Sequence, residues 1–309
     1  MRSSLEPAAT RRFRLASTTP RFACFARSRL AVSFAAPDDP TTLFAARAGV
    51  RRPSDNERWQ AALLGTNPAQ RAGRAFFAAL PSPPRCQLCA TPFKGPFAAM
   101  LGLIGKRPFP RNPRYCSFCV NAVLNKKVGA EVDMTALFAD VRGSTPMAER
   151  LGATGLHGAL DRFYRTGVET LIEGGAIVDR FMGDQVVGYF VPGFAGRQHQ
   201  RRAIETGLAL LRATGHVEGK PWIPVGVGVH TGTAFVGTVG GAEGMLELTA
   251  LGEHVTIAAR LAGVAGTGEL VCSEAAYDAA SVDLPGERGE ITLKGVSVPV
   301  SIRTLRPTA

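Results

Sequence analysis

The sequence predicts an α+β fold with a mixed sheet and helices on one side, preceded by a small segment with four cysteines. From residue 131 onward, strand-like and helix-like segments alternate, separated by short glycine turns. Two connections between strand-like segments, at Gly183-Asp184 and near Thr231-Gly232, are too short for a crossover and indicate antiparallel hairpins. Just before this region stand two CxxC pairs, CQLC at 86–89 and YCSFC at 115–119.

The N-terminal part divides into two ranges. Residues 1–55 are rich in Arg, Ala, Ser and Pro and show no sustained helical or strand period. A disordered extension, or a start codon assigned too far upstream, is favoured over a targeting segment, because no clear amphipathic helix is present. Residues 56–84 contain two short helical patterns separated by GTNP and end at PSPP. They are expected to form a short helical linker.

Charge is distributed unevenly along the chain. Residues 1–130 contain 21 Lys and Arg against 5 Asp and Glu, whereas residues 131–309 contain 15 against 20. A basic arm can bind nucleic acid or anionic lipid, but a solvated tail is the favoured interpretation. No run approaches the roughly 18 apolar residues of a membrane helix. We therefore expect no transmembrane segment and a cytoplasmic location.

The range 85–128 is expected to be a zinc-binding segment. Cys86, Cys89, Cys116 and Cys119 form two CxxC pairs, and each pair can place two thiolates on one tetrahedral ion. Two disulfides or a redox CxxC remain as alternatives, but paired CxxC motifs favour structural Zn²⁺. The basic stretch between the pairs could touch phosphate, although a solvated stretch is favoured.

The remaining elements are expected from hydrophobic periodicity. Strands are expected at 132–139, 176–182, 185–191, 223–230, 233–239, 245–250, 269–272, 289–294 and 298–304. Helices are expected at 145–151, 155–173, 196–214, 253–264 and 274–280.

Two aspartates are the first candidates for chemistry. Asp140 ends an apolar strand and, by period two, shares a face with Val132, Met134, Ala136 and Phe138. Asp184 lies at the tip of the hairpin beside Gly183. If the hairpin pairs with the first strand, both carboxylates converge at one end of the sheet and can hold one or two Mg²⁺ ions. Taken singly, each has an ordinary alternative: a helix cap for Asp140 and a turn residue for Asp184.

Four motifs, read together, resemble a known family. LFADVRGST, DRFMGDQVVGYF, VGVGVHTGTAFVGTVG and LTALGEHVTIAARL have the order and spacing of class III nucleotidyl cyclase catalytic domains, over about residues 131–305. The cysteine segment also resembles one found before some bacterial cyclase domains. The resemblance implies a ferredoxin-like βαββαβ core, a head-to-tail homodimer, and conversion of ATP to 3′,5′-cyclic AMP and pyrophosphate.

The resemblance also implies roles for particular residues. Two Mg²⁺ or Mn²⁺ ions would be bound by Asp140, Asp184 and the carbonyl of Val141. The triphosphate would lie against the turn formed by Arg142, Gly143, Ser144 and Thr145. The partner subunit would contribute the transition-state arginine, Arg260, together with Thr256. The base would be recognised by Arg180 and Thr249.

The chain departs from the family pattern at several of these positions. Thr256 stands where the family usually has Asn, and its hydroxyl reaches less far. Arg180 replaces the base-recognising Lys, and Gly226 replaces an Arg present in some members. ATP is favoured over GTP only modestly. Two alternatives stay open: a weak or inactive cyclase-homology domain that binds nucleotide, and a nucleic-acid-binding zinc protein, with nucleic acid the less favoured partner.

His230 lies in a run of small and apolar residues near a turn. A catalytic base and a structural histidine are both compatible with this setting. The structural interpretation is favoured.

Overall fold

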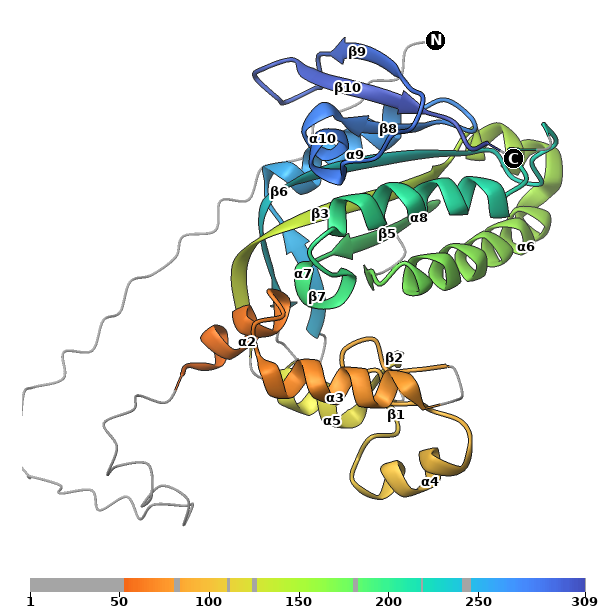
Figure 1. Ribbon diagram of the computed structural model, residues 1–309. Helices are drawn as coiled ribbons and strands as arrows, with labels where there is room; N and C mark the ends of the chain where they lie inside the picture. The colour runs from red at the N-terminus through yellow and green to blue at the C-terminus, as the bar shows by residue number, and fades with distance from the viewer. Residues whose placement is uncertain are drawn as a thin grey trace, which may run out of the picture. The chain divides into compact units, whose positions relative to one another are not determined.

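The computed structural model describes residues 53–80, 84–109, 112–123, 127–179, 183–217, 219–240 and 246–308 (Figure 1). Most of the predicted basic extension and the predicted base-binding Arg180 lie outside these residues. The N-terminal elements are α2 (Asp55–Leu63), α3 (Pro68–Ala79), α4 (Pro96–Leu103), β1 (Pro108–Phe109), β2 (Asn112–Cys116) and α5 (Ser117–Val123). The strands of the large sheet are β3 (Gly129–Val141), β4 (Ile177–Val178), β5 (Gln185–Phe190), β6 (Val225–Gly240), β7 (Leu246–Leu251), β8 (Leu270–Ser273), β9 (Glu287–Ile291) and β10 (Val300–Leu305). The other helices are α6 (Ser144–Glu173), α7 (Pro192–Ala195), α8 (His199–Ala213), α9 (Glu253–Val264) and α10 (Glu274–Ala280).

The large sheet is mixed, as the sequence predicts. Its strand order is β4-β5-β3-β6-β8-β10-β9, and β7 pairs with β6 outside this path. Every pairing is antiparallel except that of β6 with β8, which is parallel. The predicted hairpin at Gly183-Asp184 joins β4 to β5 and places β5 beside β3. The ends of β3 and β5 therefore meet, which brings the two aspartates to one end of the sheet.

The hairpin predicted near Thr231-Gly232 is wrong, because residues 225–240 form one continuous strand. β3 pairs with β6 without interruption from Gly129 opposite Gly237 to Val141 opposite Val225. The small residues of β6 make room for α9 instead of forming a turn. A Cβ at Gly232 would lie 2.4 Å from the ring of His254.

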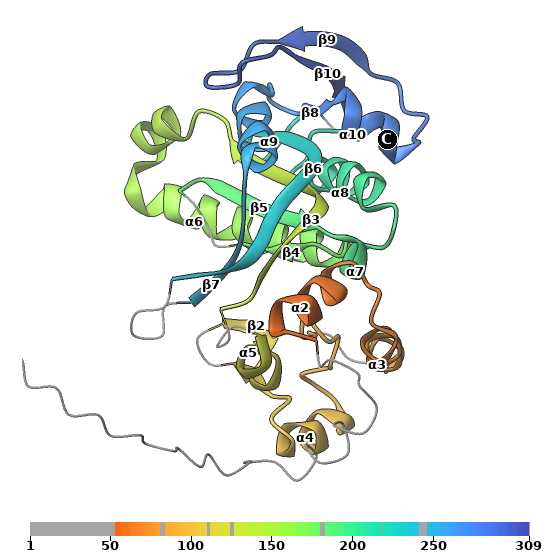
Figure 2. The same ribbon diagram turned by 90° about the vertical axis from the view of Figure 1, so that its left-hand side faces the viewer.

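Helices cover both faces of the sheet, which differs from the prediction of helices on one side (Figure 2). On one face, Leu137 and Ala139 of β3 pack in a core with Ile204 and Leu208 of α8, joined by residues of α6 and α10. On the other face, Met134, Ala136 and Phe138 pack with Ala258 and Ala262 of α9. The approach of α9 is close because a Cβ at Gly228 would lie 2.1 Å from the amide nitrogen of Ala262.

Two predicted helices join into the single long helix α6. The predicted breaks around residue 152 correspond to a kink at Gly152, whose φ of 69° lies in the left-handed region. None of the helices in the described part of the chain combines the length and apolar character needed to cross a membrane.

The N-terminal elements share a core with the sheet. The indole nitrogen of Trp59 in α2 donates a hydrogen bond of 2.9 Å to the carbonyl of Val236 in β6. Trp59, Leu63 and the cysteines Cys86 and Cys116 are buried in the same apolar cluster as Met134. The range 56–84, expected to be a linker, thus includes a helix that packs directly on the sheet.

Candidate active site and cysteine centre

The two predicted metal-binding aspartates influence each other electrostatically. Asp140 pairs with Gln185 across β3 and β5, and the amide of Val141 donates to the carbonyl oxygen of Asp184 at 3.2 Å. Burial raises the pKa of the Asp140 carboxyl, and the negative charge of Asp184 raises it further, whereas Arg142 lowers it. The backbone pairing therefore places Asp140 and Asp184 at the same end of the sheet, and repulsion between their negative charges favours a bound cation.

Arg142 is a positively charged side chain that already contacts one of the two carboxylates. Its guanidinium forms an ion pair with Asp140, whose side chain is 14% exposed, and donates a hydrogen bond of 2.9 Å to the carbonyl of Gly263 in α9. The Nε atom of Arg142 is buried without a hydrogen-bond partner among the described residues. The carboxylates thus already attract a cation, and their hard oxygen atoms suit Mg²⁺ or Mn²⁺.

The turn between β3 and α6 presents free backbone amides. Gly143 is the N-terminal capping residue of α6, with a φ of 65° and no side-chain hydrogen bond to the helix. The first amides of α6, at Ser144 and Thr145, belong to the group that an α-helix leaves without intrahelical partners. Such an end attracts anions, including phosphates. The amide of Arg142 instead donates a hydrogen bond of 2.8 Å to the carbonyl of Pro224, so the amides available to a phosphate are those of residues 143–145. Binding of the triphosphate by residues 142–145 stays a prediction.

A cleft of about 660 Å³ lies against α9, on the face of the sheet to which Phe138 points. Thr256 and Arg260, four residues apart on α9, both line the cleft. Lys294, between β9 and β10, lines it from the other side. Gln185, the residue after Asp184, also lines it. The cleft therefore holds Thr256 and Arg260 together, whereas neither Asp140 nor Asp184 lines it.

The two predicted base-recognition residues have different outcomes. Arg180 lies outside the described residues. Thr249 is buried, and its hydroxyl donates a hydrogen bond of 2.8 Å to the carboxylate of Asp179. Asp179 also accepts a hydrogen bond of 2.6 Å from Tyr189. Thr249 is not among the residues that line the cleft. A direct contact between Thr249 and the base stays a prediction.

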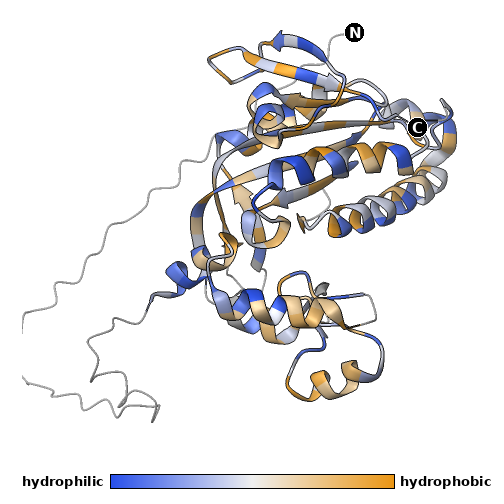
Figure 3. Ribbon diagram, in the orientation of Figure 1, coloured by the Kyte–Doolittle hydropathy of each residue, from blue (hydrophilic) through white to orange (hydrophobic). Residues whose placement is uncertain are grey.

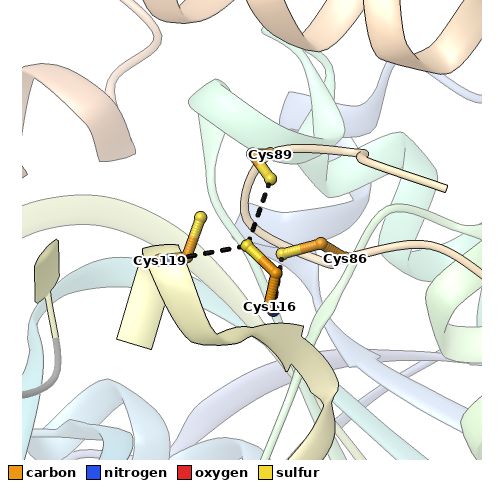
Figure 4. Close-up of side chains that lie close together, drawn as sticks. All are labelled: Cys86, Cys89, Cys116 and Cys119. Carbon is orange, nitrogen blue, oxygen red and sulfur yellow. Dashed lines mark hydrogen bonds between the residues drawn. The ribbon is translucent and has the colours of Figure 1, made fainter. Parts of the chain in front are cut away.

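The four predicted zinc ligands are gathered in one cluster (Figure 4). The sulfur atoms of Cys86, Cys89, Cys116 and Cys119 lie within 4.8 Å of one another, and those of Cys89 and Cys116 are 3.7 Å apart. Zinc–sulfur bonds of about 2.3 Å on a tetrahedral ion require sulfur atoms about 3.8 Å apart. None of the cysteines in the described ranges forms a disulfide. The arrangement fits a tetrahedral zinc site.

Positive charges surround the cysteine cluster. Arg74 of α3 donates hydrogen bonds of 2.8 and 2.7 Å to the carbonyls of Gln87 and Leu88, the two residues between the first pair of cysteines. The ammonium group of Lys106 lies 3.9 Å from the sulfur of Cys89. A zinc ion bound by four thiolates carries a net charge of about −2, and Arg74 and Lys106 offset it.

Sequence reasoning missed several of these supporting residues. Tyr164 of α6 donates a hydrogen bond to the carbonyl of Gly183 and so holds the turn that carries Asp184. Asp179 positions Thr249, and Arg74 and Lys106 neutralise the cysteine cluster. Asp179 directly precedes Arg180 in the motif DRFMGDQVVGYF, and this position could have identified it as a candidate site residue. For Tyr164, Arg74 and Lys106 the sequence offers no local pattern, because their partners are distant backbone and sulfur atoms.

His230 has the environment of a structural histidine. It is buried, and its ring nitrogens lie 2.7 Å from the hydroxyl of Ser273 and 3.0 Å from a ring nitrogen of His254. Burial lowers its pKa to about 4, and the neighbouring His254 contributes to the shift. At neutral pH the imidazole is therefore uncharged and links β6, β8 and the start of α9.

We expect acid to destabilise the protein partly through His230. The pKa of His230 is lower in the folded chain than in the unfolded chain, where it is about 6.5. The contribution of the neutral His230 to the free energy of unfolding is therefore fully present above pH 6.5. It is lost as the pH falls towards 4 and amounts to on the order of 3 kcal/mol. Denaturant unfolding between pH 7.5 and 4.5 should show a shallower pH dependence for His230→Gln than for wild type. His157→Gln, which changes an exposed histidine of α6, is the control. Equal slopes for the two variants would contradict the assignment.

Comparison with known proteins agrees with these features. The model of the family described as adenylate and guanylate cyclase catalytic domain matches residues 127–304. An adenylate cyclase of Anabaena cylindrica is 28% identical over 156 residues, which are 45% of this chain and 29% of that protein. Adenylate cyclase 1 of Rhizobium meliloti (strain 1021) is 28% identical over 138 residues, 43% of this chain and 21% of that protein. The chain thus spans less than a third of the length of these relatives.

Solved structures show the same fold. The adenylyl cyclase CyaB from P. aeruginosa superposes with a TM-score of 0.52 and 26% identity, over 59% of this chain and 97% of that chain. The guanylyl cyclase Cya2 superposes with a TM-score of 0.53 and 24% identity, over 59% of this chain and 95% of that one. The matched range contains the sheet, both aspartates and the cleft on α9, and it covers more than half of the sequence. The chain therefore belongs to the adenylate and guanylate cyclase catalytic domain family.

Proposed function

We propose that this chain converts ATP to 3′,5′-cyclic AMP and pyrophosphate, with two Mg²⁺ or Mn²⁺ ions, at a site shared between two copies of the chain. The observation that carries the proposal is the position of Asp140 and Asp184 at the paired ends of β3 and β5, beside the turn at Gly143 that opens α6. The cleft that holds Arg260 opens on the same face of the sheet.

The chain's own residues have distinct tasks in this reaction. Asp140, Asp184 and the carbonyl of Val141 would hold the ions. When bound, the ions make the ribose 3′-hydroxyl more acidic and neutralise phosphate charge. The amides of residues 143–145 bind the triphosphate, with Arg142 at the same turn. The 3′-oxygen forms a bond to the α-phosphorus while the bond from that phosphorus to the bridging oxygen breaks. Pyrophosphate leaves, and the hydroxyl proton goes to solvent.

Arg260 and Thr256 complete the site from the partner subunit. The guanidinium of Arg260 can stabilise charge that develops on the phosphates as the bond breaks. The Thr256 hydroxyl donates a hydrogen bond of 3.3 Å to the carbonyl of Gly252, one helical turn earlier. A shared site is supported by Leu251 and Val264, which line the cleft and are 51% and 47% exposed. A second copy placed over the cleft would remove this apolar surface from water.

ATP is the proposed substrate, although the family includes cyclases of both kinds. The curated relatives described above are adenylate cyclases, whereas one of the superposed structures is a guanylyl cyclase. Thr249, held by Asp179, and Arg180 are the proposed base-recognition residues. The cysteine cluster is proposed to hold a structural Zn²⁺ ion that fixes the N-terminal elements on the sheet.

The purified chain should be assayed with ATP and GTP side by side, each with Mg²⁺ and with Mn²⁺. We expect cyclic AMP and pyrophosphate in equal amounts, at a higher kcat/KM than for cyclic GMP formation. Asp184→Asn should abolish both activities, because it removes a metal ligand. Tight nucleotide binding without product would contradict turnover and favour a nucleotide-binding module. A higher kcat/KM for GTP would overturn the substrate assignment while leaving the cyclase reaction intact.

A further inference from the structure

The helix α4 exposes an unusual amount of apolar surface. Its sequence, PFAAMLGL, contains no polar side chain, and Ile104 follows directly. The side chains of Phe97, Met100, Leu103 and Ile104 are 41%, 60%, 87% and 61% exposed. At positions i, i+3, i+6 and i+7 they lie on one side of the helix. We call these four side chains the α4 surface. A group of large apolar side chains exposed on a protein surface is typical of an interaction site.

The helix that carries the α4 surface is fixed to the neighbouring helices. Leu101, next to Phe97 on the helix surface, is 8% exposed and marks the buried edge of the helix. Immediately after the helix, the carbonyl of Gly105 accepts a hydrogen bond of 2.9 Å from the amide of Phe118 in α5. The ammonium group of Lys106 lies 4.9 Å from the ring centre of Phe77 and 4.7 Å from that of Phe118. The helix is thus attached to the elements that carry the cysteine cluster.

Both ends of the α4 surface are basic. Lys94 precedes the helix and Lys106 and Arg107 follow it, with Lys94 and Arg107 exposed. The whole range 85–128 contains eight Lys and Arg residues and no Asp or Glu. In Figure 3, α4 is largely apolar and lies on the side of the N-terminal elements that faces away from the large sheet. A partner that covers this surface must therefore be apolar at its centre and negatively charged around it.

We propose that the α4 surface docks on an anionic lipid bilayer. At a bilayer surface, exposed apolar side chains insert at the boundary between headgroups and acyl chains, and neighbouring basic side chains add attraction to anionic headgroups. In this chain the apolar groups come from α4 and the basic groups from the residues on either side of it. Stable docking takes both contributions, and this range supplies both. Nucleic acid fits less well, because four large aliphatic or aromatic groups would remain in water against a phosphate backbone. A second copy fits less well because two surfaces of the same positive charge would meet.

The proposal goes beyond the cyclase reaction. It places α4 in contact with lipid through the elements that the cysteine cluster stabilises. The catalytic domain would then lie at a membrane surface although no helix of the described chain spans one. Docking is expected to depend on zinc, because α4 lies between the two pairs of zinc-binding cysteines.

The test uses the full chain and large unilamellar vesicles of phosphatidylcholine, with and without 30% phosphatidylserine. We expect the wild-type protein to sediment with the anionic vesicles and at least tenfold less with the neutral ones. Leu103→Glu should weaken anionic-vesicle binding at least tenfold. Lys94→Ala combined with Arg107→Ala should weaken it several-fold and flatten its dependence on salt. Val298→Ser, which removes a side chain that is 68% exposed near β10, should bind like wild type.

Further measurements on Leu103→Glu distinguish a lipid bilayer from other partners of the α4 surface. Leu103 is so exposed that Leu103→Glu should keep the wild-type circular dichroism spectrum and zinc content. Vesicle binding unchanged by Leu103→Glu would overturn the proposal and assign any binding to the basic N-terminal residues. A loss of self-association in Leu103→Glu, measured by sedimentation velocity without lipid, would assign the surface to a second copy. Equally strong loss of binding to a 20-nucleotide RNA in the same variant would assign it to nucleic acid.

Discussion

A one-to-one mixture of the Asp140→Asn and Arg260→Ala proteins is expected to recover about a quarter of the wild-type cyclase activity. Each protein alone should lose about a thousandfold in kcat, because one lacks a metal ligand and the other lacks the cation that meets the phosphates. If one chain supplies the carboxylates and its partner supplies Arg260, half of the mixed dimers are heterodimers. One of the two sites in each heterodimer is then intact.

This experiment distinguishes a shared site from a site within one chain. In a site built from one chain, every site in the mixture keeps one defect, and no activity returns. The matched control mixes Asp140→Asn with Asp184→Asn. Both defects then lie in the same half of the site, so that no heterodimer can contain an intact one. Activity at the level of the separate variants in both mixtures would contradict the shared site. Recovery in the control would show that the variants themselves are not inactive.

Removal of the metal from the cysteine cluster is expected to have the second large effect. Metal analysis should find about one zinc per chain in wild type and none in Cys86→Ser. The free energy of zinc binding is largely folding free energy, on the order of 10 kcal/mol for a four-cysteine site. Because the cysteines share an apolar cluster with Trp59 and Met134, its loss should also lower the thermal stability of the cyclase domain.

Cys272→Ser is the matched control for this prediction. Cys272 is buried in β8, away from the cluster, and its thiol contacts the carbonyl of Arg303 at 3.4 Å, a contact that a serine hydroxyl can keep. This variant should retain zinc and most of its stability. In a Trp222→Phe background, the fluorescence of Trp59 should change on chelation of wild type and should not change on further chelation of Cys86→Ser. Zinc retained by Cys86→Ser, or an unfolding midpoint unaffected by chelation, would contradict the role of the cluster.

Local sequence patterns were sufficient to single out the two aspartates and the four cysteines, whereas the roles of the other candidate site residues came from the family resemblance. Period-two alternation in β3 placed Asp140 on the face of Phe138, and the Gly183-Asp184 turn brought Asp184 alongside it. The spacing of Thr256 and Arg260 put both on one side of α9. These relations depend on strand and helix geometry over a few residues, which is why the sequence contains them. The spacing of the cysteines similarly predicted a cluster that the structure brings together.

The two wrong predictions about the fold concern places where segments distant in sequence pack against each other. The hairpin near Thr231-Gly232 was wrong because the length of β3 keeps β6 extended, and the small residues there admit α9. The assignment of all helices to one face failed for α9, because Gly228 allows that helix to lie directly on the opposite face. Such choices depend on packing between residues distant in sequence, and no local period encodes them.

The sequence by itself determined the order of the elements, the carboxylate pair and the four cysteines, since each depends on residue type and short spacing. Only the tertiary structure decided that Arg142 links Asp140 to α9, that Trp59 fastens the N-terminal elements to β6, and that α4 leaves its apolar side exposed. Burial and ion pairing depend on which surfaces meet, and that is a property of the folded chain as a whole.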